Sequence, residues 1–202
     1  VLVAAALAFL AAGWRSTTEG LRRIVHESVP VLLAAGCVSA GAGVALEKSF
    51  DRFDTLPALL VLVPAHLSSS GALGGILSGR LSSKLFLGLV APDPRPDREA
   101  RHDISLVVLL AVPVYLANGV GAHLVARALG QASPGLFDMV VLSLLGGALA
   151  ISFVVAVAYY GTIAAYRTGL DPDTYGIPVV SSSVDLVGSL TLIIGIALLG
   201  LG

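Results

Sequence analysis

Charged residues and cysteine are scarce in this sequence. Lys, Arg, Asp and Glu make up only 12% of the 202 residues, and the net charge is -1. A chain with no basic excess lacks the electrostatic footprint that DNA or RNA requires, so we expect no nucleic-acid partner. The single cysteine, Cys37, excludes an intrachain disulfide and a cysteine-based metal cluster.

Hydrophobic residues dominate instead. They account for 56% of the chain, and the mean hydropathy is +0.92, which is typical of proteins that lie in a lipid bilayer. A helix needs about 20 mainly apolar residues to cross the hydrocarbon core. Runs of about this length occur at 29–46, 56–78, 104–126, 137–161 and 176–201. We therefore predict an all-α integral membrane protein with five complete spans.

A shorter apolar run opens the sequence. Residues 1–13 are too few to cross the bilayer, so we interpret them as the end of a preceding transmembrane helix in a longer polypeptide. Residues 14–28 would then be a linker, and 29–202 the five-helix transmembrane domain. The opening run is similar in character to LTLIIGIALLGLG near the C-terminus, which suggests two tandem repeats, although such short apolar runs can also match by chance.

The basic residues predict the orientation of the spans. Segments on one side of the five spans carry nine Lys and Arg residues, and those on the other side carry three. Cytoplasmic loops retain positive charge, so we expect a multi-pass cell-membrane protein with a cytoplasmic N-terminal linker and an external C-terminus. Arg80 and Lys84, one turn apart at the cytoplasmic end of the second span, are expected to extend to lipid phosphates.

Asp185 is the one acidic residue well inside a predicted span. An ionised carboxylate near the bilayer centre costs at least about 2.5 kcal/mol, so it normally faces an aqueous cavity or the protein interior and marks an ion route. Pro178 frees a backbone carbonyl one turn earlier, and hydroxyls follow at Ser181, Ser182 and Ser183. Mg²⁺ and Ca²⁺ prefer such hard oxygen ligands. The alternatives are a carboxylate that bonds to neighbouring helices and serines that serve helix packing.

Other polar residues lie inside or beside the spans. Ser69 and Ser70 in the second span either line a polar passage or satisfy each other's hydrogen bonds. We expect His66 in the same span to be neutral and bonded to a carbonyl. Asp171 and Asp173 precede the fifth span, where they either concentrate cations at its cytoplasmic mouth or form a solvated turn.

The run DPDTYGIPVVSSSVDLVG resembles the last-helix signature of the MgtE-type magnesium transporters. The segment PALLVLVPAHLSSSGALGGILSGRLSSKLFLGLV is similar to the second span of that family, so the resemblance covers residues from about 28 to 201. It implies five helices per repeat and a pore on a two-fold or pseudo-two-fold axis. The partner would be a second copy of the repeat, in a homodimer or in the same chain, with this one as the C-terminal repeat.

The resemblance also implies that Mg²⁺ is the transported ion, that Asp185 helps to bind it, and that carbonyls near Ser181 contribute. Bacterial members commonly carry Asn in the second span, where this chain reads SSSGALGG, so selectivity among divalent cations stays open. A purely structural membrane protein would not need Asp185. An intramembrane aspartic protease would need two such carboxylates, so we expect a transporter rather than an enzyme.

Overall fold

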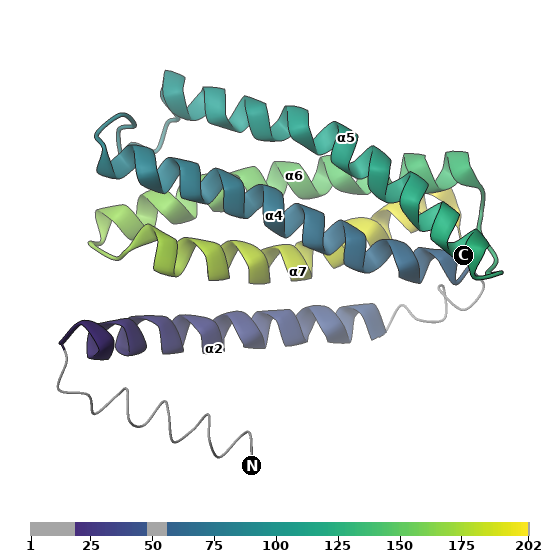
Figure 1. The fold of residues 1–202 in the computed structure, drawn as a ribbon, viewed down its shortest axis with the longest axis horizontal. Coiled ribbons are helices and arrows are strands. Elements are labelled where there is room, and N and C mark those ends of the chain that lie inside the picture. Colours follow the sequence, from purple (N-terminus) through teal and green to yellow (C-terminus); the bar gives the residue numbers. More distant parts are fainter. Residues whose placement is uncertain (1–18, 48–55, 202) are drawn as a thin grey trace, which may run out of the picture.

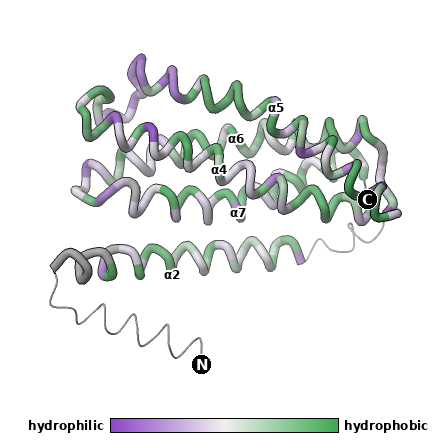
Figure 2. Tube along the Cα trace, in the orientation of Figure 1, coloured by the Kyte–Doolittle hydropathy of each residue, from purple (hydrophilic) through white to green (hydrophobic). Residues whose placement is uncertain are grey.

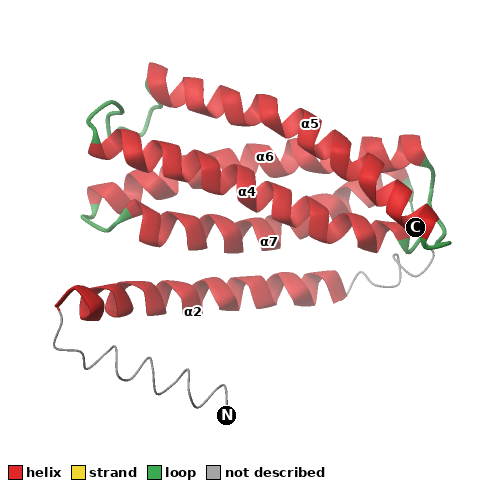
Figure 3. Ribbon diagram, viewed as in Figure 1, coloured by secondary structure: helices red, strands yellow, loops and turns green. Residues whose placement is uncertain are grey.

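The computed structural model describes residues 19–47 and 56–201, which form helices and connecting loops (Figure 3). The helices are α2 (Glu19–Glu47), α4 (Ala58–Phe86), α5 (Arg98–Ala128), α6 (Leu136–Arg167) and α7 (Pro172–Leu199). All five are long and apolar enough to cross a membrane. The predicted all-α membrane fold with five spans is confirmed.

The helices are longer than the apolar runs that predicted them. α4 continues eight residues past the run 56–78, and α2 begins at Glu19, inside the segment 14–28 that we interpreted as a linker. Such extensions keep the backbone hydrogen-bonded while polar side chains emerge from the apolar layer. Residues 1–13, which we interpreted as the end of another helix, lie outside the described residues.

Four helices make a bundle and the fifth lies beside it. α4, α5, α6 and α7 pack against one another, whereas α2 packs mainly along α7 (Figure 1). Only 6% of the apolar window of α2 is buried, compared with 44% for α7. α2 is therefore attached to the bundle chiefly through α7.

The bundle is held together by an aliphatic core and by close approaches at glycine. A Cβ at Gly119 of α5 would lie 2.8 Å from the carbonyl oxygen of Met139, and a Cβ at Gly147 of α6 would overlap the ring of Tyr115. Small residues at such positions let membrane helices pack backbone to backbone. Larger side chains there would separate α5 from α6.

The loop between α4 and α5 is fixed to the end of the bundle. Asp97 caps α5 by accepting a hydrogen bond from the backbone N–H of Ala100 at 2.8 Å, and its second oxygen accepts from the N–H of Ala91 at 3.0 Å. Tyr159 of α6 donates to the carbonyl of Asp93 at 2.9 Å. Figure 2 shows the hydrophilic start of α5 and the hydrophobic stretch that follows it.

Candidate ion site

Asp185 lies half-buried near the middle of α7, on the side that faces α2. Its Oδ2 accepts a hydrogen bond from Ser39 Oγ of α2 at 2.6 Å, a length typical of a hydroxyl bonded to an ionised carboxylate. Within residues 19–47 and 56–201 this is the only hydrogen bond to the carboxylate, and no Lys, Arg or His forms an ion pair with it. Among the described residues, the carboxylate therefore has a neutral partner only.

The hydroxyl residues before Asp185 differ in their surroundings. Ser181 is exposed and lies one turn before Asp185 on the same face of α7. Ser182 is buried and donates to the carbonyl of Val179 at 3.3 Å, and Ser183 is half-buried. Of these serines, Ser181 therefore lies most directly in line with Asp185 along α7. The hydroxyl of Ser182 is bonded to its own helix.

A groove of about 250 Å³ lies between α2 and α7. α2 and α7 run in the same direction (Figure 1). The residues that line the groove come before Ser39 in α2 and before Asp185 in α7, so the groove lies on the N-terminal side of the Ser39–Asp185 pair. Six waters at about 30 Å³ each occupy roughly 180 Å³, so the groove is large enough for a hydrated cation. Its lining consists of Val31, Ala34, Ala35, Val38, Tyr175, Val179, Ser182 and Ser183.

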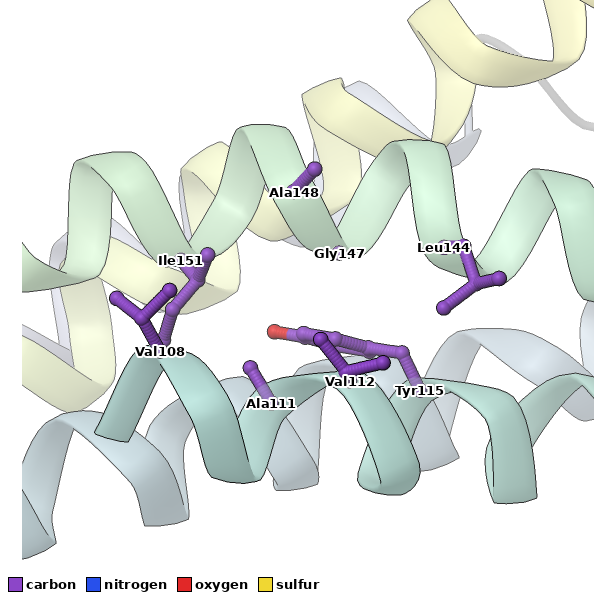
Figure 4. A pocket seen from close by; sticks show the side chains of 8 residues that line it. All are labelled: Val108, Ala111, Val112, Tyr115, Leu144, Gly147, Ala148 and Ile151. Carbon is purple, nitrogen blue, oxygen red and sulfur yellow. The ribbon is translucent and has the colours of Figure 1, made fainter. Parts of the chain in front are cut away.

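A second pocket, of about 120 Å³, lies between α5 and α6 (Figure 4). Its lining is aliphatic apart from the ring of Tyr115, whose hydroxyl is 2.6 Å from Ser70 Oγ and so is already hydrogen-bonded. A cation needs several oxygen ligands. This pocket does not supply them and is not a candidate ion site.

Ser69 and Ser70 join α4 to α5. Ser70 Oγ donates to the carbonyl of His66 at 2.8 Å and pairs with Tyr115 Oη, while Ser69 Oγ accepts from Asn118 Nδ2 at 2.9 Å. The two hydroxyls are thus bonded to α5 and to their own helix rather than to each other. A pore-lining role for them stays a prediction.

His66 differs from the sequence-based expectation. It is fully buried, and neither ring nitrogen has a hydrogen-bond partner among the described residues, so the expected bond to a carbonyl is wrong. The imidazole packs instead against the ring of Tyr115, with the two centroids 5.1 Å apart. Gly146 of α6 provides the space, because a Cβ there would lie 3.3 Å from the ring.

Arg80 and Lys84, which we expected to extend to lipid phosphates, have partners inside the protein. Arg80 Nη2 lies 2.6 Å from Oδ1 of Asp103, and Lys84 Nζ lies 2.9 Å from Oδ2 of the same carboxylate, which is completely buried. Lys84 also pairs with Glu99 at 3.1 Å. Arg80 and Lys84 on α4 thus pair with Glu99 and Asp103 on α5, which the sequence analysis did not predict. Contact of the exposed part of Arg80 with lipid stays a prediction.

The two acidic residues predicted at the mouth of the fifth span lie at the start of α7. Asp171 is exposed immediately before the helix, and its carboxylate accepts from Thr174 Oγ1 at 3.3 Å. Asp173 is in the first turn, and its side chain lies outside the described part of the structure. Their effect on cations stays a prediction.

Sequence reasoning missed five residues of these networks, namely Ser39, Glu99, Asp103, Tyr115 and Asn118. Asn118 is the only amide side chain in its span, and this could have marked it as a candidate. Ser39 lies among other small residues, and nothing in the sequence distinguishes it from them. No group of three or more His, Cys, Asp or Glu within metal-binding reach occurs in the part of the chain that the structure describes. Among those residues, Asp185 is thus not part of such a group.

A model of the MgtE divalent cation transporter family matches residues 63–195, two thirds of the chain. The match begins within α4 and ends within α7, so it covers all but the outer ends of the four-helix bundle and includes Asp185. No solved structure gives a significant match.

The curated relatives belong to one group of solute carriers. Solute carrier family 41 member 2 is 29% identical in Xenopus laevis over 79% of this chain and 29% of that protein, and 28% identical in Gallus gallus over 84% and 32%. Member 3 from Rattus norvegicus is 28% identical over 79% of this chain and 35% of that protein. The chain thus spans about a third of the length of these relatives.

Proposed function

Because the chain belongs to the MgtE family of divalent cation transporters, we propose that it carries Mg²⁺ across the cell membrane with the Asp185 carboxylate as an ion ligand. The observation that carries this proposal is the position of Asp185 in the middle of a span with a neutral hydroxyl as its partner. Such a carboxylate is costly in a purely structural role. A cation that passes through the site would compensate its charge.

Mg²⁺ suits the ligands near Asp185. The ion binds oxygen, sheds its waters reluctantly and is commonly held by one or two carboxylates with several waters retained. Asp185 would supply the carboxylate, and backbone carbonyls near Ser181 would supply further oxygen ligands. The groove between α2 and α7 has room for the retained waters. We propose that Ser182, which lines the groove, and Asp171 and Asp173 at the start of α7 attract and guide the ion.

A complete pathway requires a second repeat. A single repeat places one mid-span carboxylate in α7, and transporter sites are commonly built at the interface between repeats. The second copy would come from a homodimer or from a tandem repeat in the same polypeptide. Crosslinking in native membranes, together with the mass of the native polypeptide, tests this. A polypeptide with one repeat that never crosslinks to a second copy would contradict it.

The main test is Asp185→Asn, measured as Mg²⁺ uptake into proteoliposomes. The variant keeps the side-chain volume and removes the charge, so a loss of about 3 kcal/mol of ion binding would lower apparent affinity more than a hundredfold. The protein should still fold, since removal of a carboxylate with no ion-pair partner relieves desolvation. Expression and monodispersity would be checked in parallel.

Asp138→Asn is the matched control, because Asp138 lies in the first turn of α6 at the end of a span. It should transport like the unmodified protein. If Asp185→Asn is folded and also transports normally, Asp185 is a structural residue and the proposed ion site is wrong.

We also propose that the loop between α4 and α5 is cytoplasmic and that the loop between α5 and α6 is external. Arg95 and Gln131 are exposed in these two loops and are suitable positions for cysteine substitution in a Cys37→Ala background. A membrane-impermeant maleimide added outside intact cells should label Gln131→Cys and not Arg95→Cys. The opposite pattern would invert the topology, and equal labelling of both would contradict it.

A further inference from the structure

We propose that Ser39 of α2 is a second oxygen ligand of the transported ion, adjacent to Asp185. This inference rests on the proposed function of Asp185. It adds α2, the helix outside the bundle, to a site otherwise built on α7.

The distance between the two oxygens suits a small cation. Ser39 Oγ and Asp185 Oδ2 are 2.6 Å apart. In octahedral Mg²⁺ coordination, with bonds of about 2.0–2.1 Å, neighbouring ligand oxygens lie about 2.9 Å apart. The observed pair therefore needs to separate only slightly to accept Mg²⁺.

The hydroxyl of Ser39 is directed at the carboxylate rather than at its own helix. Serines in apolar helices commonly bond to a carbonyl three or four residues earlier, as Ser152 does with Ala148 at 2.8 Å. Ser39 Oγ instead donates across the interface to Asp185. A hydroxyl has one hydrogen and two lone pairs, so it can bond to the carboxylate and still offer a lone pair to a cation.

The packing of α2 against α7 sets the spacing of this pair. Ala42 of α2 is buried, 3% exposed, one turn after Ser39, and Ala35 lines the groove one turn before it. Alanines at these positions allow α2 to approach α7 closely. Because the rest of α2 is little buried, an ion bound between Ser39 and Asp185 would also link α2 to the bundle.

The first test compares Ser39→Ala with Ser39→Thr, using Ser152→Ala as a control that removes an exposed hydroxyl bonded within its own helix. Mg²⁺ binding would be measured by titration of the purified full-length protein, and Mg²⁺ uptake in proteoliposomes. Ser39→Ala should raise the half-saturating Mg²⁺ concentration about tenfold. Ser39→Thr, which keeps the hydroxyl, and Ser152→Ala should bind Mg²⁺ normally.

The second test does not depend on a loss of function. Ser39→Cys in a Cys37→Ala background replaces the hard oxygen with a sulfur ligand, which favours soft ions. Cd²⁺ should then inhibit Mg²⁺ uptake at a concentration at least tenfold lower than it does for Ser152→Cys in the same background.

The outcomes separate the two proposals. If Ser39→Ala binds Mg²⁺ normally and Ser39→Cys gains no Cd²⁺ sensitivity, while Asp185→Asn loses binding, Ser39 is not a ligand and the proposed function stands. If Asp185→Asn also binds and transports normally, both proposals are wrong. If Ser39→Ala fails to fold, the Cd²⁺ sensitivity of Ser39→Cys decides whether Ser39 is a ligand.

Discussion

Two buried or half-buried carboxylates in this protein have opposite surroundings. Asp103 of α5 is completely buried and lies within 3 Å of both Arg80 and Lys84 of α4, at 2.6 and 2.9 Å. Asp185 of α7 is half-buried and bonds to the hydroxyl of Ser39. The first charge is balanced by fixed cations, and the second has no cationic partner among the described residues.

The difference separates a structural role from a binding role. A carboxylate held by two cations has its electrostatic needs met by the protein, and a further cation would have to displace Arg80 or Lys84. A carboxylate with only a hydroxyl partner gains most when a cation arrives. We therefore assign Asp103 to the joining of α4 to α5, and we propose ion binding for Asp185 alone.

Asp103→Asn should give the largest effect on stability. The change leaves Arg80 and Lys84 without their buried charged partner. We expect a loss of about 2–3 kcal/mol in the free energy of unfolding, which is below the usual cost of breaking a buried ion pair because Arg80 is 46% exposed. Denaturant unfolding in mixed micelles would measure it. Mg²⁺ uptake per folded molecule should stay normal, so a specific loss of uptake would place Asp103 in the ion path and remove the contrast.

Lys84→Met should have a smaller effect. Met keeps the apolar length of the side chain, and Arg80 remains bonded to Asp103 through both Nε and Nη2, so we expect a loss of about 1 kcal/mol. The double variant Lys84→Met/Asp103→Asn should lose less unfolding free energy than the sum of the losses in the two single variants, because both changes remove the same interaction. Strict additivity would show that the Lys84–Asp103 pair contributes nothing.

Tyr115→Phe should cost a similar or smaller amount, about 1 kcal/mol. It removes the hydroxyl that pairs with Ser70 in the buried contact between α4 and α5 and leaves the ring against His66 in place. Neither carboxylate bonds to this hydroxyl, so Mg²⁺ uptake should not change. Reduced uptake in a stable variant would connect the Ser70 network to the ion path.

Asp171→Asn should have the smallest effect of the four. The residue is exposed at the start of α7 and would act on ions only through a screened field. Mg²⁺ uptake should fall less than twofold at low ionic strength, and the difference should vanish in about 1 M salt. A loss comparable to that of Asp185→Asn would show that the mouth, rather than the middle of α7, holds the binding site.

Sequence alone predicts most of the fold because the bilayer restricts the possible structures. Every backbone polar group inside hydrocarbon must be bonded within the chain, so a long apolar run becomes a helix whatever its neighbours are. The five spans and the unusual position of Asp185 follow from this rule. Helix ends were less predictable, since outside the apolar layer hydropathy no longer limits the helix, as the start of α2 at Glu19 shows.

Side-chain partners could not be predicted in the same way. The charges of Arg80 and Lys84 are visible in the sequence, but their pairing with Asp103 depends on how α4 and α5 are rotated and shifted against each other. Likewise, the bond between Ser39 and Asp185 joins residues 146 positions apart. Small residues at such interfaces can show that two helices pack closely, but they do not identify which residues of the neighbouring helix they meet.

The sequence by itself therefore determined that the described part of this chain crosses the membrane five times and carries one carboxylate deep in α7, because burial in lipid depends on composition and length. Only the tertiary structure decided which charges are balanced. Asp103 meets two cations and Asp185 meets a hydroxyl, since the energy of a charge in a low-dielectric interior depends on the atoms within a few ångströms of it. Helix packing, and not sequence position, sets those distances.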